Sequence, residues 1–226
     1  MGPSCTVWWA GPVAPVAAPG LVALLDAHER ERLARFRRAG DQARYLAAHA
    51  LTRLVLGREL NVPPHKLELD RTCRCGQQHG KPRLADADAP GFSLTHAGDV
   101  VGVAVHAGPV GLDVEQVREL ADLPSMARHV RSPVEDDVGP AGFFRLWTRK
   151  EALLKSTGGG LATPMSAITL DGPAVRAWTG PGAPAGPVWL RDLRPPAPGY
   201  VGALAGPGPV APTVVQADGA ALLDYG

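Results

Sequence analysis

The sequence predicts an α+β protein of two similar lobes that meet near residue 107. Each half of the chain contains one long segment of helical periodicity and several short runs of β-type residues. The 226 residues, of which 45% are hydrophobic and 20% charged, suffice for one domain with a substantial core or for two small packed lobes. We therefore expect an N-terminal lobe over residues 1–106 and a C-terminal lobe over residues 107–226.

The N-terminal part is predicted to hold one strand and two helices. Thr6–Ala10 is expected to be the strand, and the first helix is expected over about Leu21–Phe36. Asp41 is predicted to cap a second helix that runs to about Leu60. On this helix, at 100° per residue, Leu46, Ala47, Ala50, Leu51 and Leu54 share one arc, and the opposite arc carries Gln42, His49 and Arg53. We expect the apolar arc to face the core.

The middle of the chain is predicted to form strands. Residues 61–91 are rich in turn formers. Phe92–Thr95 and Val100–Val105 then predict two strands joined at Ala97-Gly98-Asp99, and Val110–Glu115 predicts a third. Residues 117–140 are ambiguous, with helical pieces and a helix-start signal at Ser132-Pro133.

The C-terminal part is predicted to hold one strong helix followed by short strands. The helix spans Phe143–Ser156 and ends at three glycines, residues 158–160. After it, Pro and Gly separate four β-like runs, namely Ala174–Trp178, Val188–Leu193, Tyr200–Ala205 and Thr213–Ala217.

Composition argues against several classes of protein. The formal net charge is only +1, which disfavours a nucleic-acid binder. Three Cys residues are an odd count without framework spacing, so we expect a reducing compartment. Residues 1–18 contain no Lys or Arg, unlike a signal peptide, and no apolar stretch is long enough to span a membrane. These observations favour a cytoplasmic location.

Two carboxylates in the predicted strand 110–115 are candidate ligands of a hard cation. Period-two alternation places Asp113 and Glu115 on one face and Leu112 and Val114 on the other. Two adjacent ionised carboxylates need a compensating cation, and oxygen ligands suit Mg²⁺. The alternative is a solvated strand face.

The helix 143–156 offers a third carboxylate and a lysine. Trp147, Glu151 and Lys155 are spaced i, i+4, i+8 and therefore share a face. Glu151 would complete a partial Mg²⁺ shell, and Lys155 could neutralise charge on a leaving phosphate. The alternative is a surface ion pair between Glu151 and Lys155.

Other segments are candidate anion-binding sites. Thr95 and His96 end a strand before a turn, and Lys81-Pro82 forms an exposed cationic turn. Residues 28–44 carry six arginines, which either bind a phosphate or form a solvated surface offset by Glu29, Glu31 and Asp41.

Two other kinds of site find little support. Cys73-x-Cys75 with His79 is spaced too tightly for a usual zinc site. No phosphate-binding P-loop or dinucleotide-binding glycine motif is present.

Taken together, five segments resemble one family. They are Arg32–Leu56, Gly80–Leu84, Phe92–Gly98, Gly111–Glu115 and Phe143–Leu161. Their order and spacing are similar to those of the surfactin-synthetase-activating (Sfp-type) group of 4′-phosphopantetheinyl transferases, over about residues 25–165. The pairing of Gly-Leu-Asp-Val-Glu with Trp-Thr-Arg-Lys-Glu-Ala-Leu-Leu-Lys is the most specific part of the resemblance.

The resemblance implies two α+β lobes related by a pseudo-twofold axis, with coenzyme A between them. It also implies roles. The Mg²⁺ ligands are Asp113, Glu115 and Glu151, and Lys155 contacts the pyrophosphate. The phosphate contacts are Thr95 (where the family more often has Ser) and His96, the turn beside the adenosine is Lys81-Pro82, and the residues near the 3′-phosphate are Arg32 and, by a looser match, Arg44. Glu135 loosely matches an acidic residue of the linking segment.

The activity implied is transfer of phosphopantetheine from coenzyme A to a serine of an apo acyl or peptidyl carrier protein, by an enzyme that works as a monomer. Either Glu151 or a metal-activated water would take the serine proton. Two rival readings of the same residues are a Mg²⁺-dependent nucleotide or pyrophosphate hydrolase and a non-catalytic module that docks carrier domains. Neither accounts for all five segments.

Overall fold

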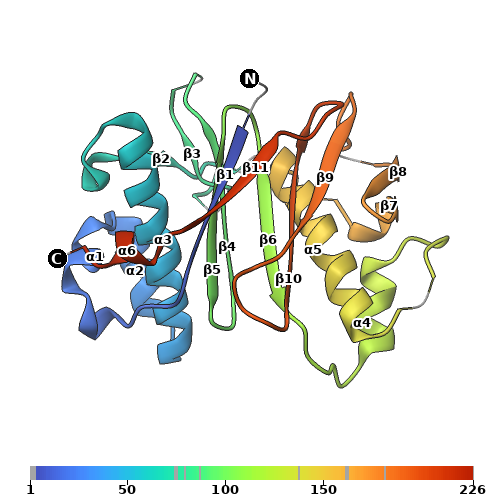
Figure 1. The fold of residues 1–226 in the computed structure, drawn as a ribbon, viewed down its shortest axis with the longest axis horizontal. Coiled ribbons are helices and arrows are strands. Elements are labelled where there is room, and N and C mark those ends of the chain that lie inside the picture. Colours follow the sequence, from blue (N-terminus) through green and yellow to red (C-terminus); the bar gives the residue numbers. More distant parts are fainter. Residues whose placement is uncertain are drawn as a thin grey trace.

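The strands lie in the middle of the molecule and the long helices flank them on opposite sides (Figure 1). This computed structural model describes residues 4–73, 76–78, 80–86, 88–136, 138–160, 163–180 and 182–225. Helix α3 (Ala39–Leu60) covers one group of strands and helix α5 (Pro140–Thr157) covers the other. The mixture of helices and largely antiparallel sheets confirms the predicted α+β class.

The first sheet has four strands in the order β11-β1-β5-β4. Strands β4 (Gly91–Ala97) and β5 (Val100–His106) form the predicted hairpin, and β1 (Ser4–Ala10) pairs antiparallel with β5. The residues between β4 and β5 are Gly98, at φ +51°, and Asp99. Glycine adopts this left-handed backbone without steric cost, so the tight turn is built into the sequence.

The second sheet has three antiparallel strands in the order β6-β10-β9. They are β6 (Gly111–Gln116), β10 (Tyr200–Pro207) and β9 (Val188–Leu193). Helix α5 packs on β6 and β10. Its C-terminal cap is Gly158 at φ +68°, so the predicted glycine stop is confirmed.

Side-chain hydroxyls join the two sheets where β4 meets β6. The Ser93 Oγ accepts the Leu112 amide at 3.0 Å, and the Thr95 Oγ1 accepts the Val114 amide at 3.2 Å. No backbone ladder pairs these two strands in the part of the chain that the structure describes. The hydroxyls therefore satisfy buried amides of β6 that a neighbouring strand would otherwise bond.

A glycine lets β6 approach α5 closely. A Cβ at Gly111 would lie 2.0 Å from the Ala152 carbonyl oxygen and 2.4 Å from the Ser156 amide nitrogen. Both atoms belong to the α5 backbone, so only glycine fits here. This contact fixes how far the carboxylates of β6 lie from the side chains of α5.

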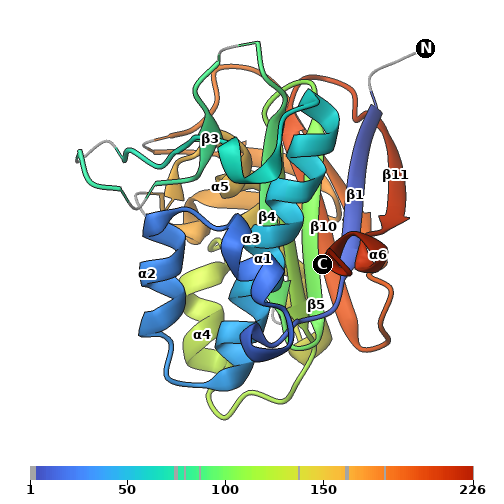
Figure 2. The same cartoon turned by 90° about the vertical axis from the view of Figure 1, so that its left-hand side faces the viewer.

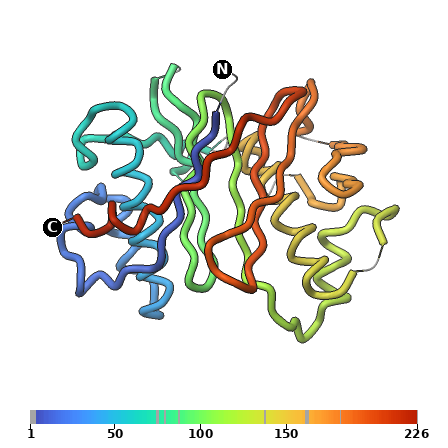
Figure 3. The backbone as a smooth tube through the Cα atoms, in the orientation of Figure 1, coloured from blue at the N-terminus to red at the C-terminus, as the bar shows by residue number. Residues whose placement is uncertain are grey.

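The C-terminal segment returns to the first sheet. Strand β11 (Thr213–Asp218) pairs parallel with β1, and helix α6 (Ala220–Leu223) packs on α3. Figure 3 shows this segment crossing from the second sheet to the N-terminal helices. The division after residue 106 and the pseudo-twofold relation remain predictions.

The prediction of a single helix over Leu21–Phe36 is wrong, because two helices occupy this stretch. They are α1 (Pro19–Leu24) and α2 (Ala27–Arg35), both visible in Figure 2. Asp26 separates them: its side chain accepts the Glu29 amide, and the Glu29 side chain accepts the Asp26 amide. This reciprocal capping box begins α2 and prevents α1 from continuing.

Helix α3 begins earlier than predicted, with Arg38 at the N-cap and Asp41 in the first turn. The prediction that its polar arc faces away from the core is wrong for Arg53, which has no exposed surface. The reason is that α2 and the 64–71 segment cover this arc and supply partners for the guanidinium.

The smaller elements lie at the periphery. They are α4 (Leu123–Val130) and the two-stranded pairs β2 (Leu69–Asp70) with β3 (Arg83–Leu84) and β7 (Ile168–Asp171) with β8 (Ala174–Trp178). The start signal at Ser132-Pro133 begins no helix, since the next helix is α5. Among the described residues, no helix combines the length and the apolar character that crossing a bilayer requires.

Candidate active site

Asp113 lies at the centre of the predicted site. Its side chain is buried on β6, and its Oδ1 accepts from Lys155 Nζ at 2.7 Å and from Thr95 Oγ1 at 3.2 Å. Burial raises the pKa of Asp113, and the Lys155 ammonium opposes that rise. The second oxygen, Oδ2, is buried and has no hydrogen-bond partner among the described residues. A buried carboxylate oxygen without a donor is a natural ligand for a cation.

The other two predicted carboxylates are electrostatically coupled to Asp113. Burial and then the charge of Asp113 raise the pKa of Glu115 to about 7. The same two causes, in the same order, raise the pKa of Glu151. Glu115 forms an ion pair with Arg118 at 3.6 Å. No polar partner of Glu151 is found in the described part of the chain, so its carboxylate is available for chemistry.

The three carboxylates do not form a closed metal centre in the structure. Within the described ranges, no group of three or more His, Cys, Asp or Glu side chains is arranged to hold a metal ion. Like charges repel, and Lys155 rather than a carboxylate takes the Asp113 Oδ1. The donor set nevertheless fits Mg²⁺, because all of its atoms are carboxylate oxygens and one of them, the Asp113 Oδ2, is buried and receives no hydrogen bond from the described residues.

Lys155 connects Asp113 to a pocket. Its Nζ also donates to the Leu112 carbonyl at 3.1 Å, and its side chain lines a cavity of about 310 Å³. The lining residues are His28, Arg32, Tyr45, His49, Arg71, Gln78, Gly80, Lys81, Pro82, Phe92, Ser93, Leu94 and Lys155. The pocket therefore contains Arg32, Lys81, Pro82 and Lys155 from the predicted set, and no carboxylate is among its lining residues. Such a wall suits an anionic ligand.

The ammonium groups of Lys81 and Lys155 bind neighbouring backbone carbonyls at the start of β6. Lys81 Nζ donates to the Val110 carbonyl at 2.6 Å, two residues before the carbonyl that Lys155 uses. Desolvation and then the positive charge of Lys155 lower the pKa of Lys81 to about 8. Two mutually repelling ammonium groups at one wall are stabilised when a phosphate anion binds between them.

The remaining predicted anion contacts are more scattered. Arg44 is bound to Asp41 and to the Gly98 carbonyl, and it does not line the pocket. Desolvation and then the positive charge of Lys155 lower the pKa of His96 to about 4, and His96 does not line the pocket. The Thr95 hydroxyl is already bonded to Asp113 and Val114, which makes it part of the β4–β6 junction.

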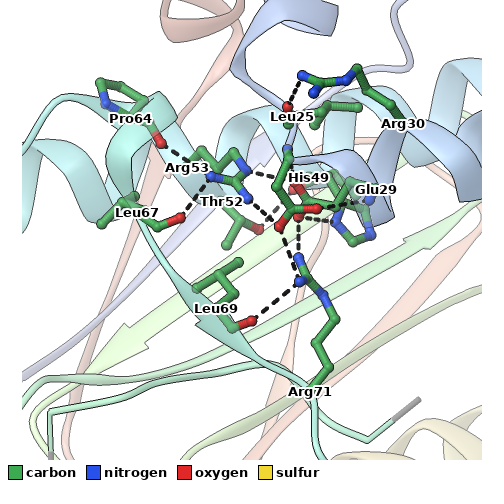
Figure 4. A network of polar contacts seen from close by, with 12 residues as sticks. Leu25, Glu29, Arg30, His49, Thr52, Arg53, Pro64, Leu67, Leu69 and Arg71 are labelled. Carbon is green, nitrogen blue, oxygen red and sulfur yellow. Dashed lines mark hydrogen bonds and ion pairs between the residues drawn. The ribbon is translucent and has the colours of Figure 1, made fainter. Parts of the chain in front are cut away.

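Sequence reasoning missed a buried ion network behind the pocket (Figure 4). Glu29, expected on a solvated surface, has no exposed area and bonds His49, Arg53 and Arg71. The spacing Asp26-x-x-Glu29 was the one available signal, because it is a capping box. Arg71 lies in a turn-rich stretch and gave no signal.

Glu135 takes part in a contact outside this site. Glu135 accepts from Lys150 Nζ at 2.6 Å and from the Leu170 amide at 2.7 Å, so it ties α5 to β7. Of the zinc candidates, Cys75 and His79 lie outside the described residues.

Comparison with known proteins covers the same part of the chain. The family model described as 4′-phosphopantetheinyl transferase, N-terminal, matches residues 17–108, and that of the 4′-phosphopantetheinyl transferase superfamily matches residues 109–180. The 4′-phosphopantetheinyl transferase HetI of Nostoc sp. is 34% identical over 63% of this chain and 63% of its own length. The 4′-phosphopantetheinyl transferase Sfp of Bacillus subtilis is 25% identical over 66% of this chain and 67% of its own length.

A phosphopantetheinyl transferase of Thraustochytrium sp. is 33% identical over 67% of this chain, and the aligned part spans 59% of that protein. The chain thus spans about two thirds or less of the length of these three relatives. The matched ranges contain every predicted site residue, including the pocket cations and the three carboxylates. On these matches, which run consecutively from residue 17 to residue 180, the chain belongs to the 4′-phosphopantetheinyl transferase superfamily.

Proposed function

We propose that the protein transfers the 4′-phosphopantetheine group of coenzyme A to a serine of an apo acyl or peptidyl carrier protein and releases 3′,5′-ADP. This is the activity of a holo-[acyl-carrier-protein] synthase, which activates fatty-acid, polyketide or nonribosomal-peptide synthases. The observation that carries the proposal is that the Lys155 side chain both bonds Asp113 and lines the cationic pocket. It supports a ligand whose phosphates begin at the carboxylates and continue along the pocket.

The pocket residues account for binding. In this proposal Lys155 and Lys81 hold the pyrophosphate, while Arg32 on α2 approaches the nucleotide end. Pro82 and Tyr45 add apolar surface for the adenosine. Arg44 and His96, which lie outside the lining, would contribute positive potential and contacts at the rim.

The carboxylates account for the chemical step. Asp113, Glu115 and Glu151 would hold Mg²⁺, which when bound neutralises charge on the pyrophosphate. Glu151 accepts the proton of the carrier serine, since its pKa is raised and it has no competing partner among the described residues. The serine oxygen attacks the β-phosphorus, and the bond to the 3′,5′-ADP oxygen breaks. Lys155 donates to the oxygens that gain charge.

Coenzyme A and carrier proteins are the partners in this proposal, and the enzyme acts as a cytoplasmic monomer. The test is incubation with coenzyme A, Mg²⁺ and a panel of apo carriers, followed by intact-mass measurement of each carrier. One or more carriers should gain one phosphopantetheine. Release of 3′,5′-ADP without any carrier would instead indicate a hydrolase. Carrier binding without any change of mass would indicate a docking module.

A further inference from the structure

The wall of the pocket is backed by a carboxylate that never reaches solvent. Glu29 on α2 has no exposed surface and accepts four hydrogen bonds. Its Oε1 accepts from His49 Nδ1 at 2.9 Å and from Arg71 Nη2 at 2.6 Å, and its Oε2 accepts from Arg53 Nε at 2.6 Å and from the Asp26 amide at 3.0 Å. Figure 4 shows His49, Arg53 and Arg71 pointing toward this carboxylate. A carboxylate with four donors is held in one orientation.

The partners of Glu29 divide into two groups. Arg53 has no exposed surface and is anchored to the Leu67 carbonyl at 3.0 Å, so it fixes Glu29 from behind. His49 and Arg71, in contrast, line the pocket. Glu29 therefore connects the rigid interior to two cationic or ionisable groups that a ligand can reach.

The His49 ring is fixed in two directions. Its Nδ1 is bonded to Glu29, and its face stacks on Tyr45 with 4.0 Å between the ring centroids. The side chain keeps 13% of its surface exposed. Nε2 is the ring nitrogen that Glu29 leaves unoccupied, and His49 lines the pocket. No bond of Nε2 to any described residue is found.

The charges behind His49 are paired. The carboxylates of Asp26 and Glu29 face the guanidinium groups of Arg53 and Arg71. Although burial alone would raise the pKa of Glu29, its hydrogen bond and charge interaction with His49 and those with Arg53 lower it to about 2. Glu29 therefore stays ionised and keeps the proton on Nδ1, and a phosphate that binds at Nε2 can share its own proton with that nitrogen.

We propose that His49 binds the 3′-phosphate of coenzyme A through Nε2 and that Glu29 is the positioning residue that orients this ring. The inference rests on the proposed function, which puts the pyrophosphate at Lys155 and Lys81 and the other phosphate toward α2 and α3. A phosphomonoester there meets Arg32 and His49, which both line the pocket. The Glu29 carboxylate itself never touches the ligand.

The test compares two nucleotides that differ only in this phosphate, 3′,5′-ADP and 5′-AMP, by calorimetric titration. His49→Gln and Glu29→Gln should each weaken binding of 3′,5′-ADP about tenfold or more and leave binding of 5′-AMP unchanged. In turnover, KM for coenzyme A should rise while kcat stays the same. The matched control is His129→Gln, because His129 is an exposed histidine on α4 bonded only to the Ser125 carbonyl among the described residues.

Several outcomes overturn the proposal. Wild-type affinity of His49→Gln for 3′,5′-ADP removes the phosphate contact, and an equal loss for both nucleotides means that the ring only shapes the pocket. If Glu29→Gln folds and binds like the wild type, Glu29 does not position the ring. If that variant does not fold, as circular dichroism would show, His49→Gln decides alone. Failure of the wild type to bind either nucleotide or coenzyme A would instead contradict the proposed function.

Discussion

Gly111→Ala tests whether the close contact between β6 and α5 sets the geometry of the site. The added Cβ would lie 2.0 Å from the Ala152 carbonyl oxygen and 2.4 Å from the Ser156 amide nitrogen. Real Cβ atoms essentially never come closer than 3.0 Å to such atoms. Since both atoms are helix backbone, no side chain can rotate away, and α5 and β6 must separate by on the order of 1 Å.

This separation has two expected costs. Overpacking of this kind destabilises a fold by about 1–3 kcal/mol, which urea denaturation measures. The shift also moves Glu151 and Lys155 relative to Asp113, which loosens the 2.7 Å contact between Lys155 and Asp113. A misplacement of about 1 Å at a reacting centre typically costs about 100-fold in rate. We therefore expect carrier modification to fall roughly 100-fold at saturating coenzyme A.

Gly186→Ala is the control, because a Cβ at Gly186 meets no atom within 4 Å. It should retain the wild-type free energy of unfolding and the wild-type rate. If Gly111→Ala behaves like this control in both assays, the β6–α5 contact does not determine the site, and the reasoning fails.

Three other perturbations test separate parts of the account. Thr95→Val removes the acceptor of the buried Val114 amide and should cost about 1–3 kcal/mol in urea denaturation, whereas Thr95→Ser should restore most of it; equal stability of the two variants would contradict the junction. Arg53→Met leaves Glu29 and Asp26 without their most buried cation and should cost about 3–5 kcal/mol, against about 0.5 kcal/mol or less for the exposed Arg35→Met. Lys81 has a pKa of about 8 and binds an anion only while charged, so the affinity for coenzyme A should fall as the pH rises from 7 to 9. Lys81→Met should flatten this pH profile of the affinity, and an unchanged profile in the variant would exclude Lys81 from binding.

Local patterns predicted most elements because each had a local physical cause. The valine-rich run Val100–Val105 and the turn at Gly98 specify the β4–β5 hairpin, and the glycines after α5 specify where that helix ends. The strand on which Asp113 and Leu112 were predicted to occupy opposite faces is present, because β6 contains both residues and pairs with β10.

The errors came from tertiary contacts. Arg53 looked like a solvent-facing residue because its partners, Glu29 and the Leu67 carbonyl, are 24 and 14 residues away. The split between α1 and α2 depends on Asp26 and Glu29 capping each other, which competes with an apolar pattern that favours one helix. Strand β7 was missed, because four residues give too short a pattern to detect.

The site was predicted in its residue types but not in its arrangement. Arg32, Lys81 and Lys155 reach one pocket from α2, from the segment before β3 and from α5, which no local pattern specifies. Thr95 was expected to face a phosphate, and its hydroxyl is bonded to β6 because the two sheets meet without a backbone ladder in the described structure.

The intact mass of an apo carrier protein after incubation with coenzyme A and Mg²⁺, measured side by side for the wild type and for Asp113→Asn, tests the central claim most directly. The account predicts a carrier heavier by one phosphopantetheine with the wild type and an unchanged carrier with the variant, which should still fold. An equal mass gain with both proteins, or no gain with any carrier, would contradict it.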